Sequence, residues 1–109
     1  MATYQNVVKA LGNVGPFSNV ITAEQQHVAT IKTLLTSYGL EVPSAASGQS
    51  APATLTAACT LGQTTEQNLV AMYDDQAPAV SAYADVVRAF ANLKEASLDS
   101  HLPAFQQCA

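Results

Sequence analysis

Apolar residues recur at helical spacing in four segments of the chain, the first of which carries Tyr4, Val7 and Leu11. The predicted helices cover about residues 2–12, 17–38, 53–80 and 85–108. No segment alternates apolar and polar residues as a half-buried strand does, so the pattern predicts an all-α fold. The short break "GNVGP" and the longer Ser/Ala/Pro/Gly-rich segment over residues 41–52 predict two helical hairpins joined by a crossover loop. We therefore expect one domain, residues 1–109, folded as an antiparallel four-helix bundle.

Ionisable residues interrupt these apolar stripes at four positions. Glu24 and His27 lie on the stripe of the second helix, and Glu66 and His101 lie on those of the third and fourth helices. Charged side chains are rarely buried unless they are paired or bind a metal. The i, i+3 spacing of Glu24 and His27 puts both on one helix face, the Glu-x-x-His arrangement with which helical bundles bind iron or manganese. The alternative is a buried ion pair held by hydrogen bonds.

The positions of Glu66 and His101 match those of the two cysteines, Cys59 and Cys108. In an antiparallel hairpin, residues at one level are equidistant from the turn, and both pairs are centred between the same two residues of the chain. A turn near residues 81–85 therefore brings each pair together. The shared level and the even cysteine count favour a disulfide between Cys59 and Cys108 over two small buried thiols.

The first helix offers no carboxylate at the level of Glu24. Its residues at that level are Ala2, Thr3, Tyr4 and Gln5. We expect Tyr4 to pack in the core, and the alternative is a supporting position beside the site. A site with one carboxylate from every helix is therefore not expected from these residues.

Two segments, "PFSNVITAEQQH" and "SHLPAF", resemble the DUF2202 family of ferritin-like four-helix proteins, and the similarity extends over nearly the whole chain. The resemblance implies a ferritin-like bundle with a carboxylate/histidine metal site, carried here by Glu24, His27, Glu66 and His101. The chain departs from a full di-iron pattern at Leu98, where a second Glu-x-x-His would have its carboxylate. The resemblance implies no particular activity.

The composition narrows the class of partners. Only 11% of the residues are charged, the formal net charge is −4, and Lys and Arg together number four. Nucleic-acid binding needs clustered basic residues, so we expect no nucleic-acid partner. No apolar run reaches the roughly 18 residues of a membrane span, and "MATYQNVVKALG" lacks the pattern of a signal peptide. We expect a mature extracellular or cell-envelope protein, with a cytoplasmic location as the alternative.

The leading hypothesis from the sequence is a transition-metal protein with the ligands Glu24, His27, Glu66 and His101. Iron is the first expectation, with manganese or zinc as alternatives, because all three accept mixed carboxylate and imidazole donors. Iron handling or chemistry with oxygen or peroxide would follow by analogy with the fold, and the sequence does not decide whether the protein is an enzyme. The rival hypothesis is a non-catalytic structural or self-assembling module, such as a homo-oligomer, in which the polar cluster is a relict.

Overall fold

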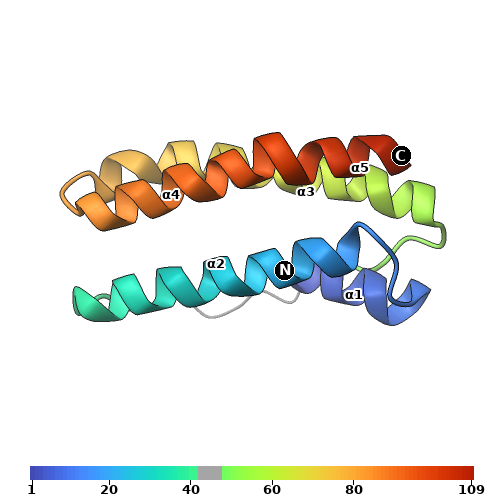
Figure 1. Cartoon of the computed structure of the whole chain (residues 1–109), viewed down its shortest axis with the longest axis horizontal. Coiled ribbons are helices and arrows are strands. Elements are labelled where there is room, and N and C mark those ends of the chain that lie inside the picture. The colour runs from blue at the N-terminus through green and yellow to red at the C-terminus, as the bar shows by residue number, and fades with distance from the viewer. Residues whose placement is uncertain (42–47) are drawn as a thin grey trace.

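The computed structural model describes residues 1–41 and 48–109, and in these ranges it contains helices and no strands (Figure 1). The elements are α1 (Ala2–Leu11), α2 (Phe17–Ser37), α3 (Leu55–Gln76), a 3-10 turn (Ala77–Val80), α4 (Ala84–Ala96), a π-helical turn (Ser97–His101) and α5 (Leu102–Cys108). Because α4, the π-helical turn and α5 follow one another without a break, they form a single rod. The predicted all-α class is confirmed.

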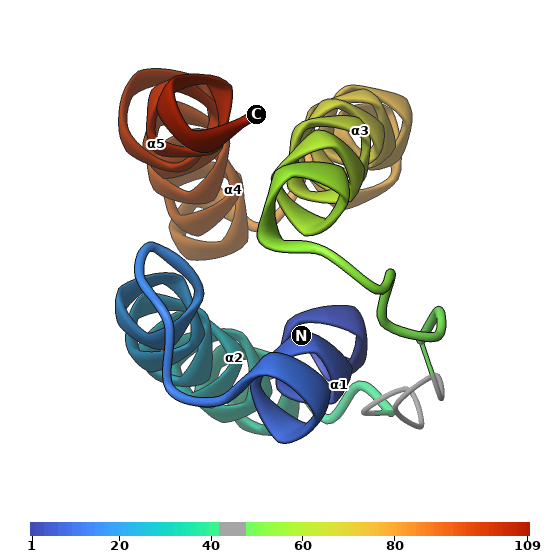
Figure 2. The ribbon, with the colours of Figure 1, turned by 90° about the vertical axis from the view of Figure 1, so that its right-hand side faces the viewer.

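Within residues 1–41 and 48–109, four helical rods form the bundle. Seen from one end, α1 lies beside α2 and α3, and the rod of α4 and α5 lies beside the same two helices (Figure 2). The molecule is elongated, with principal extents of 43 × 23 × 19 Å. Among the described residues, none of the helices combines the length and the apolar character needed to cross a lipid bilayer.

The ends of α2 and α3 follow local sequence signals. After α2, Gly39 adopts φ 70°, and the N–H of Leu40 donates a hydrogen bond of 2.8 Å to the carbonyl of Leu35. This is the glycine-dependent cap that commonly ends helices. At the start of α3, the hydroxyl of Thr54 accepts a hydrogen bond of 3.2 Å from the N–H of Ala57. The third helix therefore begins two residues later than the sequence predicts.

The chain reverses direction between α3 and α4, as the numbering of the paired residues predicts. Regular α-helix ends at Gln76 and gives way to a 3-10 turn that contains Pro78, whose ring nitrogen cannot donate a hydrogen bond. Three pairs join the two rods in opposite order along the chain: the disulfide Cys59–Cys108, the hydrogen bond Glu66–His101 and the ion pair Asp74–Lys94. The predicted disulfide is formed, with its Cα atoms 5.8 Å apart.

A π-helical turn at Ser97–His101 divides the predicted fourth helix. Pro103 follows it, and a proline within a helix both lacks an N–H and crowds the carbonyl four residues earlier. From Ala89 onward, the buried side chains of this rod follow at intervals of four residues: Ala89, Leu93, Ser97, His101 and Phe105. In a regular α-helix, each such step would turn the side chain roughly 40° past a full revolution. The wider π-helical turn removes part of this drift and keeps His101 facing the interior.

The apolar core lies at the end of the bundle that contains α1 and α5. The rings of Tyr4, Phe17 and Phe105 are fully buried, and their centroids lie 5.0 to 5.8 Å from one another. Because α1 has 10 residues and α2 has 21, α1 accompanies only the first part of α2 (Figure 1). Apolar side chains farther along α2, such as Ile31 and Leu35, are half-buried.

Part of the predicted crossover loop, residues 42–47, lies outside the described residues. Its later part runs along α1. The N–H of Gln49 donates a hydrogen bond of 3.0 Å to the hydroxyl of Thr3, and the side-chain amide of Asn6 donates one of 2.9 Å to the carbonyl of Gln49. The loop thereby holds the first turn of α1 against the bundle.

Gly62 sets the distance between α3 and α5, because a Cβ at this position would lie 2.7 Å from the ring of Phe105. We expect Gly62→Ala to lower the free energy of unfolding by about 1 to 3 kcal/mol, since overpacking forces side chains or backbone to move. Thr64→Ala, on the exposed side of the same helix, is the control and should change stability little. Urea denaturation measures both, and wild-type stability of Gly62→Ala would contradict this packing.

Candidate metal centre

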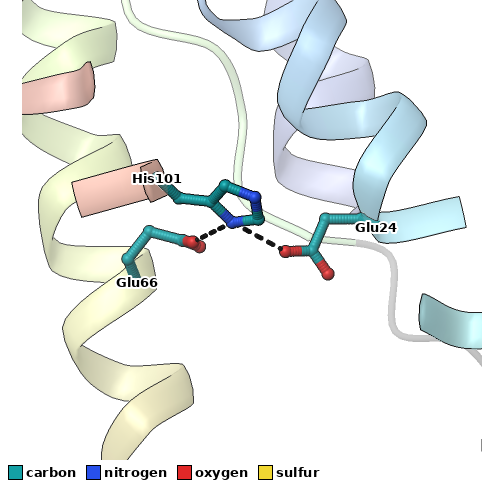
Figure 3. A group of neighbouring side chains, drawn as sticks. All are labelled: Glu24, Glu66 and His101. Carbon is teal, nitrogen blue, oxygen red and sulfur yellow. Dashed lines mark hydrogen bonds and ion pairs between the residues drawn. The ribbon is translucent and has the colours of Figure 1, made fainter. Parts of the chain in front are cut away.

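Three buried side chains from different rods converge inside the bundle (Figure 3). They are Glu24 of α2, Glu66 of α3 and His101 of the π-helical turn, with exposed fractions of 8%, 0% and 6%. The Nδ1 atom of His101 lies 2.6 Å from Oε1 of Glu66 and 3.3 Å from Oε1 of Glu24. One potential ligand atom from each of the three lies within 4.8 Å of those of the other two. The structure therefore brings together three of the four site residues that the sequence predicts.

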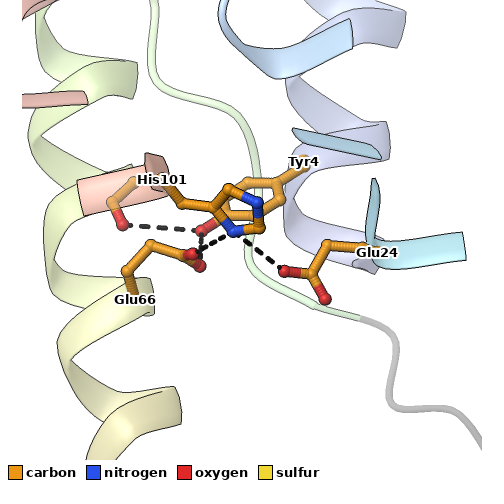
Figure 4. Close-up of polar contacts among 5 residues, drawn as sticks. Tyr4, Glu24, Glu66 and His101 are labelled. Carbon is orange, nitrogen blue, oxygen red and sulfur yellow. Dashed lines mark hydrogen bonds and ion pairs between the residues drawn. The ribbon is translucent and has the colours of Figure 1, made fainter. Parts of the chain in front are cut away.

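Tyr4 joins this group from α1 (Figure 4). Its hydroxyl donates a hydrogen bond of 2.7 Å to Oε2 of Glu66 and lies 3.5 Å from the carbonyl oxygen of Gly62. Burial, and then the negative charge of Glu66, raise the pKa of Tyr4, so the phenol keeps its proton and remains a donor. The first helix thus contributes a phenol where the sequence offers no carboxylate. Tyr4 therefore packs in the core, as the sequence predicts, and its hydroxyl also takes the alternative position beside Glu66.

His27 lies next to the group without belonging to it. Its ring is half-buried, and its centroid lies 6.3 Å from that of His101. Because His27 follows Glu24 by nearly one helical turn, it is roughly 4.5 Å farther along α2, on the side away from the aromatic core. The shared helix face that the sequence indicates is therefore insufficient to bring both side chains to the same point, and a ligand role for His27 stays a prediction.

The electrostatics of the group centre on the proton of His101. Burial alone lowers the pKa of this imidazole, but the hydrogen bonds to Glu24 and Glu66 and the negative charges of both outweigh burial and raise the pKa to about 9. Among the described residues, the two carboxylates form ion pairs with His101 alone. With both carboxylates ionised and the imidazole protonated, the group carries one excess negative charge.

The donor set suits a divalent transition metal. Two ligand atoms that bind the same metal ion at about 2.1 Å lie roughly 3 Å from each other. The separations of 2.6 and 3.3 Å from His101 to the two carboxylates lie on either side of that value. A divalent ion in place of the His101 proton would neutralise both carboxylates. The polar atoms of the group are also hydrogen-bonded without a metal, because in the described part of the chain no buried side-chain nitrogen or oxygen lacks a partner. The site can therefore hold a metal or stand as a hydrogen-bonded cluster.

Comparisons with known proteins assign no function to this chain. No family model matches it, and no curated protein or solved structure does so either. Membership of the ferritin-like DUF2202 family therefore stays a prediction from the sequence.

The raised pKa of His101 gives the metal-free protein a defined pH dependence. Below its ordinary pKa of 6.5 the imidazole is protonated in both the folded and the unfolded chain, and its contribution to stability is complete. Between pH 6.5 and about 9 the folded chain alone holds the proton, so that contribution is lost as the pH rises. The slope from this one group is at most about 1.4 kcal/mol per pH unit.

Urea denaturation of chelator-treated protein at several pH values tests this dependence. We expect wild type to exceed His101→Gln in stability most at pH 6 and progressively less toward pH 9. The variant removes the titrating imidazole and serves as the reference for ionisations outside the group of Glu24, Glu66 and His101. A stability difference that is constant or grows across this range would contradict the described charge state.

Proposed function

We propose that this chain is a ferritin-like metal-binding protein that holds a transition metal among Glu24, Glu66 and His101. The observation that supports the proposal is the convergence of two buried carboxylates and one imidazole from three separate rods. Burying two carboxylates beside a single proton is costly, because the excess negative charge has lost its hydration. A cation removes that excess charge and uses every donor of the group.

Iron is the first expectation for the metal, and manganese and zinc are the alternatives. Mixed oxygen and nitrogen donors suit all three ions. The protein offers three donors, whereas such ions take four or more, so positions remain for water or another small ligand. Bound iron would supply one-electron redox chemistry, which makes iron handling or reaction with oxygen or peroxide the activity to look for.

The residues of the chain have separate parts in this proposal. Glu24 and Glu66 supply the negative charge, and His101 must release its Nδ1 proton before that nitrogen can bind. Tyr4 keeps Glu66 oriented through its hydrogen bond, as partners of metal ligands commonly do. The rings of Phe17 and Phe105 exclude water from the same side of the site.

The arrangement of the rods and the disulfide are consistent with this proposal. In our proposal, the pair of α1 and α2 and the pair of α3 and the α4–α5 rod form an antiparallel, ferritin-like bundle. The site lies between the two pairs, about halfway along the bundle. A disulfide persists in oxidising compartments. We therefore propose an extracellular or cell-envelope location.

A structural role is the second candidate. It is favoured by one observation: in the described residues, every buried side-chain nitrogen and oxygen has a hydrogen-bond partner without any metal. In that case the hydrogen-bonded group would fix the register of the rods, as single buried polar residues do in coiled coils.

Elemental analysis of protein prepared without an affinity tag separates the two candidates. After anaerobic incubation with Fe(II) and removal of excess metal, we expect roughly one equivalent of iron per chain. Glu66→Gln preserves the size of the side chain and removes its charge, and should weaken binding by about ten-fold or more. Glu95→Gln, the same change at an exposed position of α4, should bind as wild type does. Wild-type protein that retains no metal after this treatment would contradict the proposal.

A further inference from the structure

A cavity of about 200 Å³ lies between α2 and α4, on the side of the candidate metal centre away from the aromatic core. Its lining consists of His27, Thr30, Ile31, Ala89, Asn92 and Leu93. Thr30 and Asn92 are exposed, whereas Ala89 and Leu93 are buried. The cavity therefore leads from the surface into the bundle.

His27 connects this cavity with the candidate metal centre. It lines the cavity, and its ring lies against that of His101 with the centroids 6.3 Å apart. A helical residue directs its side chain toward the N-terminal end of its helix, so His27 leans back toward Glu24. One half-buried imidazole thus separates the space of the cavity from the buried donors.

The other side of the group is closed. Tyr4 contacts Glu66, and the rings of Phe17 and Phe105 pack against Tyr4 with no exposed surface. A small molecule can therefore reach the group most directly from the side of His27.

We propose that a small anion enters through this cavity, completes the coordination of the bound metal, and accepts a hydrogen bond from His27. The inference rests on the proposed metal binding and adds to it an entry route and a binding residue. His27 is in this view a partner of the exogenous ligand and not a ligand of the metal, in contrast to the expectation from the sequence.

The size and chemistry of the cavity restrict the ligand. A water molecule occupies about 30 Å³ of liquid, so a cavity of about 200 Å³ accepts a small molecule of roughly six or seven heavy atoms at most. The lining contains no carboxylate that would repel an anion, and His27 and Asn92 both provide N–H donors. Azide is a suitable probe because it is a linear anion of three atoms that binds open metal positions.

The role of His27 is tested by titrating azide into protein loaded with Co(II), whose visible absorption reports on its coordination. We expect a saturable spectral change in the wild type. His27→Phe keeps a ring at this position and removes the donor, and should weaken azide binding by about ten-fold, the effect of losing a hydrogen bond to a charged group. Its affinity for cobalt should equal that of wild type, because the metal donors are untouched.

The route is tested by a matched pair of variants on α2. The hydroxyls of Thr30 and Thr33 are both exposed and each donates to the carbonyl four residues earlier, at 3.1 and 3.0 Å, but only Thr30 lines the cavity. Thr30→Phe should obstruct the mouth and slow azide association in stopped-flow mixing by about ten-fold, since a bulky ring fills much of the space. Thr33→Phe should associate at the wild-type rate.

Several outcomes would overturn the inference. Wild-type azide affinity in His27→Phe would remove the binding role of His27, and weaker cobalt binding in that variant would make it a metal ligand instead. Equal association rates in Thr30→Phe and Thr33→Phe would exclude this route. Failure of wild-type protein to bind cobalt, seen before azide is added, would overturn the metal proposal and this inference together.

Discussion

The structure depends on the sharing of one proton between two buried carboxylates. The Nδ1 atom of His101 faces Glu66 at 2.6 Å and Glu24 at 3.3 Å, with nine-tenths or more of each residue removed from water. Removing His101 would leave two uncompensated buried carboxylates, and breaking a buried ion pair in this way typically costs about 3 to 5 kcal/mol. The helices must therefore hold three side chains from three rods in a fixed arrangement, and the same arrangement suits a metal ion.

The features around the group all contribute to that arrangement. Gly62 lets α5 approach α3 until Phe105 contacts the backbone, one turn from Glu66. The disulfide joins the same two rods about two turns beyond the pair of Glu66 and His101. The π-helical turn rotates His101 into the interior, and such turns occur frequently at functional sites. Tyr4 restrains the second oxygen of Glu66. The site thus lies beside closely packed and cross-linked helices.

Much of this arrangement follows from helical periodicity alone. The four apolar stripes predict the rods, and the common centre of the two residue pairs predicts both the turn and the disulfide, because equidistance from a turn is a property of any regular hairpin. The same equidistance from the turn predicts that Glu66 and His101 lie at one level along the bundle. Periodicity also predicts the level of Tyr4, but the hydrogen bond of Tyr4 depends on the direction of a single side chain, which periodicity does not determine.

The differences from the sequence prediction have local causes. The π-helical turn has only Pro103 as its signal, and a proline can equally end or bend a helix. His27 shares a face with Glu24, but whether both reach one point depends on the tilt and rotation of α2, which tertiary packing decides. The measurement that tests metal binding most directly is an anomalous difference map from crystals of the protein loaded with Co(II). We expect one peak at about 2 Å from Nδ1 of His101 and from oxygens of Glu24 and Glu66. Peaks only at exposed carboxylates such as Asp74, or none at all, would contradict it.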